Sequence, residues 1–230
     1  MTEAGAGAWQ VERHVGSARA FHDRNLPDPV RRAVWWFEVT EPTVVLGSTQ
    51  TVAVVDAAAA ARSGVEVVRR RSGGGAVWLA PGVTTWVDVV LPAGDPHWVD
   101  DVGRAAAWLG EAWVAALEEL GVADLLLHEG PMIGSARSGL VCFAGVSPGE
   151  VTVGGRKVVG VSQRRTRHGA RFQCVVLHQW DPRPLIEVLD LPLGERETMA
   201  SELAGVGAGI GAVEAAAVVA GLVAQLRTDA

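Results

Sequence analysis

The chain has 230 residues, 49% of them apolar, and a formal net charge of −6. This length fits one large domain, or one domain with a small appendage, and the acidic balance argues against a general nucleic-acid binder. No apolar run reaches the ~18 residues of a membrane span, and the N-terminus lacks the order of a signal peptide, so we expect a cytoplasmic protein with no membrane partner. Two cysteines cannot make a four-cysteine zinc site, and we expect no bound metal.

Short strands and loops are predicted for the first part of the chain. Residues 1–8 are rich in Gly and Ala and are expected to be disordered. Asp56 is expected to cap a short helix that ends at Arg62, because an aspartate side chain accepts hydrogen bonds from the first N–H groups of a helix. Runs of β-branched and aromatic residues predict strands over residues 33–39, 43–46, 65–69, 76–79 and 85–91.

The longest predicted helix runs from Asp95 to Leu120. Asp95 is the expected N-cap, Pro96 suits the first turn, and Gly121 ends the helix. The apolar residues between them recur at helical spacing, which indicates a helix that packs on a sheet rather than a cofactor site. A short strand over 125–127 and a loop over 129–137 follow.

A β-hairpin is predicted around Gly154-Gly155, which separates two β-prone runs. Both turn positions of a tight hairpin can need a positive φ, which glycine adopts without a Cβ clash. Gly160 is expected to break the second run, because a glycine inside a strand marks a bulge or a close approach of another group. A strand over 170–177, a short helix that ends at Leu189, a glycine-rich linker over 205–211 and a terminal helix complete the chain.

Lys157 follows the hairpin turn and is the only lysine in the sequence. An ammonium is a compact point charge, whereas a guanidinium is a planar fork, so a site that holds an oxyanion or contacts several ligand oxygens can require a lysine. A surface lysine without a special role is the alternative.

A triple glycine follows three arginines and a serine in the stretch Arg69 to Ala76. Glycines between two β-prone runs let the backbone approach a ligand and present N–H groups to it, and the arginines suit a carboxylate or phosphate. A flexible hairpin loop is the alternative. The stretch is not a P-loop, because the Gly-Lys-Ser/Thr ending is absent, and a strand follows where a dinucleotide fingerprint needs a helix.

Together these two stretches resemble a known family. Residues 69–77 resemble the arginine–serine–triple-glycine motif of the lipoate–protein ligase A family, and residues 155–164 resemble its lysine motif, in the same order. The resemblance covers roughly residues 30–180. It implies an α/β (α+β) fold of the biotin/lipoate ligase type, with a mostly antiparallel sheet flanked by helices. We accordingly expect a catalytic domain over 9–180 and a small helical extension over 181–230 packed on it.

The resemblance also implies a site and an activity. Members of the family attach lipoyl or octanoyl groups to one lysine of a lipoyl domain, so the implied acceptor is a lipoyl-domain protein. Lys157 would contact the acyl carbonyl, and the phosphate where an adenylate forms. The implied lining of the acyl or acyl-adenylate pocket is Arg70, Ser72, Gly73, Gly74, Gly75, Ala76, Gly160, Ser162 and Gln163.

One of two chemistries in the family uses ATP and Mg²⁺ to convert free lipoate or octanoate into an acyl-adenylate. These ligases carry an Asn-Asp pair where this chain has Gly149-Glu150. Many of them also need a C-terminal accessory domain or a partner chain, and the segment after Trp180 is short for such a domain. The sequence therefore departs from the ligase pattern.

The second chemistry belongs to cysteine-dependent octanoyltransferases, which take octanoate from an acyl carrier protein or another lipoyl protein. Their motif resembles Cys142-Phe143, Ser147 and Glu150 in residue type and spacing. A thiolate can accept an acyl group from a thioester and pass it to an amine without ATP or another cofactor. We predict such an acyltransferase, with Cys142 as nucleophile and Lys157 as electrostatic partner. For the protein, the alternatives are an ATP-dependent lipoate ligase and a non-catalytic acyl-binding protein. For Cys142, the alternative is a small buried hydrophobic residue without a catalytic role.

Two further features bear on acyl specificity and on partners. The family usually has His-Gly in the strand after the lysine motif, and here Gln173-Cys174 stands in that place, a departure that implies either an altered acyl specificity or a loss of activity. A basic cluster could dock an acidic carrier or lipoyl domain, with a solvated strand end as the alternative. The cluster consists of Arg164, Arg165, Arg167 and Arg171.

Overall fold

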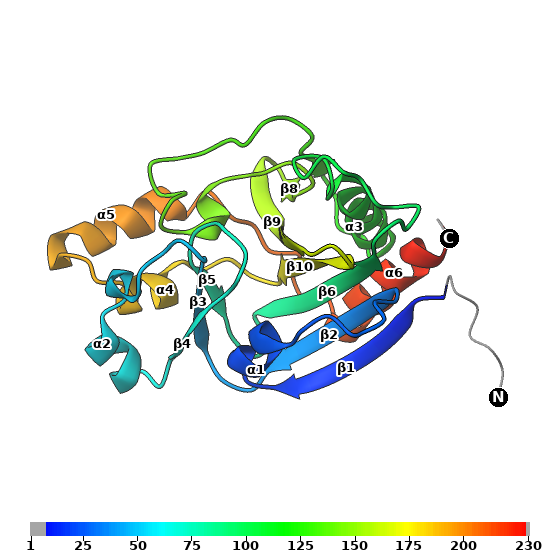
Figure 1. Cartoon of the computed structure of the whole chain (residues 1–230). Coiled ribbons are helices and arrows are strands. Elements are labelled where there is room, and N and C mark those ends of the chain that lie inside the picture. The colour runs from blue at the N-terminus through cyan, green and yellow to red at the C-terminus, as the bar shows by residue number, and fades with distance from the viewer. Residues whose placement is uncertain (1–7, 229–230) are drawn as a thin grey trace.

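The computed structural model describes residues 8–228, so the disorder expected for residues 1–8 falls almost wholly outside the described part. Two sheets form its framework (Figure 1). The larger sheet consists, in spatial order, of β1 (Gln10–Gly16), β2 (Ala33–Val39), β6 (Thr84–Pro92), β10 (Gly169–Leu177), β9 (Arg156–Arg165), β8 (Val151–Val153) and β7 (Leu125–Leu127). The smaller sheet consists of β4 (Glu66–Arg69), β3 (Thr43–Leu46) and β5 (Val77–Leu79).

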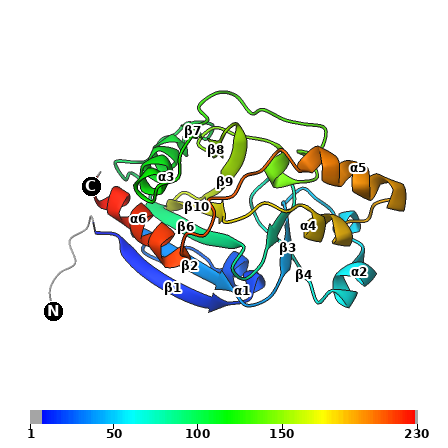
Figure 2. The same ribbon diagram turned by 180° about the vertical axis from the view of Figure 1, so that it is seen from behind.

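All neighbours in the larger sheet are antiparallel except β1 and β2. The helices α3 (Ala107–Glu119) and α6 (Ala215–Thr228) contact each other and cover one face of this sheet (Figure 2). Their apolar sides, including Trp113 and Leu222, pack on Val87 and Val89 of β6. The mostly antiparallel α/β architecture predicted above is confirmed.

The other face of the larger sheet packs on the smaller sheet and on α1 (Ala18–Asp23). Phe21 of α1 stacks on Phe37 of β2 with ring centroids 4.4 Å apart, and Val45 and Leu79 of the smaller sheet join the same core. A third cluster places α2 (Ala57–Arg62), α4 (Arg183–Val188) and α5 (Leu193–Leu203) against the smaller sheet. The two sheets therefore enclose an apolar space between them.

The expected start of the long helix and the expected break at Gly160 are wrong, and the hairpin-loop alternative for the triple glycine is excluded. The long helix begins at Ala107, because the Asp95 carboxylate accepts hydrogen bonds from Arg32 at 2.7 and 3.0 Å and from the His97 N–H rather than capping a helix. Strands β4 and β5 both pair with β3, so the triple glycine crosses the small sheet and is not a hairpin loop. Strand β9 continues through Gly160, which lies opposite Val175 in β10.

The C-terminal segment is hydrogen-bonded to strand β9 of the larger sheet. The backbone of Lys157 in β9 donates to Val206 O at 3.0 Å and accepts from Ala208 N–H at 2.9 Å. The glycine-rich stretch is thus hydrogen-bonded in place instead of being a loose linker, and α6 adds its apolar face to the main core. No helix within residues 8–228 is both long enough and apolar enough to cross a membrane.

Candidate active site

The triple-glycine loop lies directly against the turn that carries Cys142. This turn is the 3₁₀ helix η2 (Cys142–Ala144). The Cys142 N–H donates to Ala76 O at 2.9 Å, and the Ala76 N–H donates to Leu140 O at 2.8 Å. A Cβ on Gly75 would lie 2.7 Å from the Cys142 nitrogen, so only glycine allows the two segments to approach this closely. Main-chain contacts therefore place the cysteine.

Arg70 holds the glycine loop from inside. It is 4% exposed, and its Nη2 donates to Gly73 O at 2.7 Å and Gly75 O at 2.9 Å, while Nη1 donates to Val45 O at 3.3 Å. The guanidinium lines the pocket described below, but its N–H groups are directed at backbone carbonyls. Its main contribution in this structure is to the shape of the loop.

Lys157 is buried beside Cys142. The predicted hairpin forms, with φ of 54° at Gly154 and 76° at Gly155, and Lys157 follows it in β9. Its Nζ lies 2.7 Å from the Glu150 carboxylate, donates to the carbonyls of Gly145 at 3.1 Å and Cys142 at 3.2 Å, and lies 3.9 Å from Cys142 Sγ.

The charge of Lys157 is maintained by its neighbours. Burial acts to lower the pKa of Lys157, but negative charge at Cys142 and Glu150 outweighs burial, so its pKa is raised above the usual value. The Glu150 carboxylate is itself held by the Ser147 N–H at 2.7 Å and the Val161 N–H at 3.0 Å. Glu150 thus ties the Cys142 loop to β9 and orients the ammonium.

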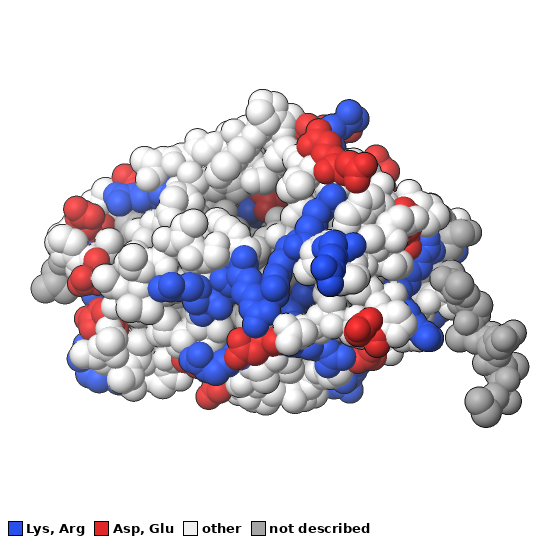
Figure 3. Space-filling model, viewed as in Figure 1, with Lys and Arg blue, Asp and Glu red and all other residues white. Residues whose placement is uncertain are grey.

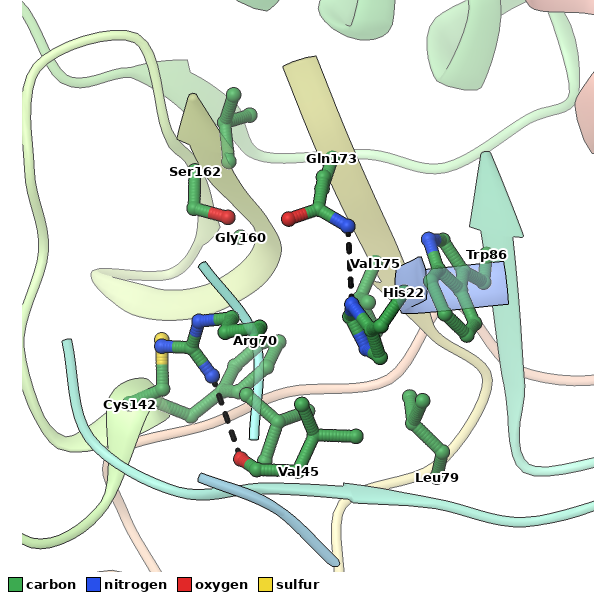
Figure 4. A pocket seen from close by; sticks show the side chains of 13 residues that line it. His22, Val45, Arg70, Leu79, Trp86, Cys142, Gly160, Ser162, Gln173 and Val175 are labelled. Carbon is green, nitrogen blue, oxygen red and sulfur yellow. Dashed lines mark hydrogen bonds between the residues drawn. The ribbon is translucent and has the colours of Figure 1, made fainter. Parts of the chain in front are cut away.

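An apolar pocket lies between the two sheets, with Cys142 on its wall (Figure 4). The pocket is partly open to solvent. A pocket with mostly apolar walls and few polar groups suits an alkyl chain. Its apolar side chains are Val45, Val77, Leu79, Trp86, Phe143, Val161 and Val175.

The structure brings most of the predicted site residues to this region. Cys142, Arg70, Gly160 and Ser162 line the pocket. Lys157 contacts Cys142 but does not itself line the pocket. A Cβ on Gly74 would lie 3.8 Å from Cys142 Sγ. Gln163 is different: its side chain turns away and donates to Val102 O at 2.6 Å. Gly73 and Ala76 belong to the loop and not to the pocket wall.

A histidine that no motif indicated also lines the pocket. His22 of α1 is 7% exposed, and its Nδ1 lies 3.1 Å from Gln173 Nε2. A polar row continues from Gln173 Oε1 to Ser72 Oγ at 3.2 Å and on to Ser162 Oγ at 3.0 Å. Gln173, at the position where the resemblance implies a histidine, is therefore the centre of a network. Sequence spacing gave no signal for His22, because contacts across the fold bring α1 to this wall.

The predicted basic cluster is divided by the fold. Arg171 is buried in an ion pair with Asp88 and also donates to the carbonyls of Phe21 and Arg24, so it holds α1 in place and does not face a partner. Arg164 remains exposed. Figure 3 shows that basic side chains form a band across one face of the molecule. Burial, followed by the charges of Arg71 and Arg171, lowers the pKa of Arg164.

The second cysteine lies in the core. Cys174 is fully buried, and burial raises its pKa far above the usual value. Within residues 8–228, no group of three or more His, Cys, Asp or Glu side chains is placed to hold a metal ion. Of the two thiols, Cys142 alone lines the pocket.

Comparisons with known proteins agree with this geometry. The lipoyl protein ligase A/B catalytic domain model matches residues 18–216. The octanoyltransferase LipM of Kyrpidia tusciae is 31% identical over 175 residues, which are 74% of this chain and 62% of that relative. The chain therefore aligns with less than two thirds of the relative's length.

Two solved structures share the fold. A bipartite lipoate–protein ligase from Thermoplasma acidophilum, studied with its E2 lipoyl domain, superimposes with a TM-score of 0.74 at 19% identity and covers 96% of this chain and 82% of its own. A lipoate–protein ligase A bound with ATP gives a TM-score of 0.70 at 21% identity, with coverage of 96% and 84%. The resemblance found in the sequence is confirmed. The chain belongs to the lipoyl protein ligase A/B catalytic domain family, whose members are lipoyl or octanoyl transferases and lipoate–protein ligases.

Proposed function

We propose that this protein is an acyltransferase that moves an octanoyl or lipoyl group from a thioester donor to a lysine of a lipoyl domain through a thioester on Cys142. One observation carries the proposal: Cys142 Sγ lies on the wall of an apolar pocket, with the Lys157 ammonium 3.9 Å away. The similarity to an octanoyltransferase supports the same class of reaction.

In the first step the Cys142 thiolate attacks the carbonyl carbon of the donor thioester. A carbon–sulfur bond forms to Cys142, the donor's carbon–sulfur bond breaks, and the donor leaves as a thiolate that takes up a proton. The positive charge of Lys157 offsets the charge on sulfur and on the carbonyl oxygen of the tetrahedral intermediate. The alkyl chain occupies the apolar pocket.

In the second step the neutral amine of the acceptor lysine attacks the acyl carbonyl on Cys142. A carbon–nitrogen bond forms, Cys142 leaves as the thiolate, and the amine releases one proton. Lys157 is not the acceptor, because its buried ammonium is paired with Glu150. Neither step consumes ATP or needs a metal ion.

The donor in this proposal is an acidic acyl carrier protein, and the acceptor is an acidic lipoyl domain. Opposite charge speeds the encounter of such partners with a basic surface. Arg164 and Arg71 are both exposed, and they lie close enough for the charge of Arg71 to lower the pKa of Arg164, so together they provide such a surface.

The test is the intact mass of an apo lipoyl domain after incubation with this protein. One reaction holds octanoyl-acyl carrier protein without ATP, and the other holds free octanoate with ATP and Mg²⁺. We expect modification in the first reaction and an acyl adduct on the enzyme that Cys142→Ser removes and Cys174→Ser retains. Modification in the second reaction alone would refute thioester transfer and establish an ATP-dependent ligase.

A further inference from the structure

Among the described residues, nothing pairs with one of the two nitrogens of the His22 imidazole. The ring lies in the pocket wall, 7% exposed, with its centroid 4.5 Å from that of the Trp86 ring. Its Nε2 is closed to solvent and has no hydrogen-bond partner within residues 8–228. Buried polar atoms nearly always have a hydrogen-bond partner, so an unpaired atom on a residue that lines a pocket indicates that a bound ligand supplies the missing partner.

The hydrogen-bond network defines what this nitrogen offers. Ser72 Oγ donates to Gln173 Oε1, which leaves the Gln173 amide nitrogen facing His22 Nδ1. His22 Nδ1 is therefore the acceptor. Burial, followed by the charges of Arg171 and Arg70, lowers the pKa of His22 to about 3, so the ring is neutral near pH 7. The single ring proton then sits on Nε2, which is an unsatisfied donor.

The position of His22 assigns this donor to the far end of a bound chain. Figure 4 shows Cys142 and Arg70 on one side of the pocket and Trp86 on the opposite side, with the His22 ring between Gln173 and the side chains of Val45 and Leu79. An acyl chain that starts at Cys142 and crosses the pocket would reach His22 on the side away from the sulfur. A plain methyl end would leave the N–H unpaired, whereas a sulfur or oxygen near the end of the chain would accept from it.

We propose that His22 is a specificity residue that favours acyl groups carrying a hydrogen-bond acceptor near the distal end over plain fatty acyl groups. The proposal rests on the assignment of this pocket to the acyl chain. Two sources share the chemistry: the ring sulfurs of a lipoyl group, and an oxygen-bearing chain such as 8-hydroxyoctanoyl. Sulfur is the weaker acceptor, so the two sources predict effects of different size.

Calorimetric titration with the free acids octanoate, lipoate and 8-hydroxyoctanoate tests this on the full-length protein. His22→Asn keeps a group near Nδ1 for Gln173 but removes the Nε2 donor, whereas His22→Gln keeps a donor near Nε2. We expect His22→Asn to weaken 8-hydroxyoctanoate binding about tenfold, which corresponds to ~1.4 kcal/mol. Lipoate binding should weaken less, and octanoate binding should be unchanged or tighter. His22→Gln should keep the preference of the wild type.

An equal effect of His22→Asn on all three acids would overturn the proposal, and so would a failure of the wild-type protein to bind any of them. Thermal unfolding of both variants separates loss of folding from loss of selectivity. The titration is independent of catalysis: a selective pocket in a protein that modifies no lipoyl domain would support the role of His22 and refute the proposed transfer.

Discussion

The buried pair of Glu150 and Lys157 gives the sharpest prediction for stability. Both side chains are almost fully enclosed, at 3% and 2% exposure, and their charged atoms are 2.7 Å apart. We consider Glu150→Gln, which changes the charge but hardly the shape. The substitution leaves the Lys157 ammonium without its counter-charge. It also replaces a carboxylate that accepts from the N–H groups of Ser147 and Val161.

Removal of one partner from a buried ion pair costs about 3–5 kcal/mol of folding free energy. For a chain of this size, the loss corresponds to a decrease of about 6–20 °C in the melting temperature. Lys157→Met should cost a similar amount, because it leaves Glu150 charged and buried. The double variant should lose less than the sum of the two singles, by about 0.5–3 kcal/mol, because no unpaired charge remains.

Urea denaturation at pH 7 measures these differences, with Glu202→Gln as the matched control. Glu202 accepts from Arg137 at 2.6 Å, but this pair is exposed and should contribute only about 0–1 kcal/mol. The pKa of Lys157 is raised above its usual 10.5, so its contribution is fully present below that pH and is lost only as the pH rises through the higher value of the folded protein. The contribution of Lys157 to the stability of the wild-type protein should therefore be constant from pH 7 to 10. A stability deficit of Glu150→Gln equal to that of the control would refute the reasoning.

Three further predictions concern the site. Gly75→Ala should slow acylation of the enzyme at least tenfold in a single-turnover assay, because a Cβ there would lie 2.7 Å from the Cys142 nitrogen. Gly73→Ala is the control and should be close to wild type, because its Cβ would have no described atom within 4 Å. Equal rates for the two variants would contradict the close approach. Iodoacetamide should add one group to the native protein, at the half-buried Cys142, and a second only after unfolding, because Cys174 is buried and its pKa is raised; two native adducts by mass spectrometry would count against this. Arg164→Glu should slow transfer from an acidic carrier several-fold at low salt and hardly at high salt, with Arg62→Glu on α2 as the control; a salt-independent effect would exclude docking on this surface.

Local patterns predicted the parts of the fold that depend on neighbours in sequence. The Gly154-Gly155 turn and the Asp56 cap of α2 both form as expected, because their hydrogen bonds and φ angles are set within a few residues. Asp95 failed as a predicted cap because its partner, Arg32, is distant in sequence, and a long-range ion pair outweighs the local preference. The same reason explains why β4 and β5 were not recognised as neighbours of β3.

The site divides in the same way. The motifs indicated Cys142, Lys157 and the glycine loop, which the structure brings together. They did not indicate His22, a lone histidine in a short helix, whose environment is created by Gln173 and Trp86 from two strands of the larger sheet. Nor did they show that Arg171 is buried, because nothing near it in the sequence reveals its partner Asp88.

The position of Cys142 depends on the main chain, through Ala76 and the close approach of Gly75, whereas the pocket depends on side chains such as Val45, Leu79 and Val175. If the proposed transfer holds, substitutions in the pocket can therefore change the accepted chain without displacing the sulfur of Cys142. Under that proposal, the position of the reacting sulfur and the choice of acyl chain depend on different parts of the scaffold, so chain-length preference could be changed one wall residue at a time while the reaction is retained.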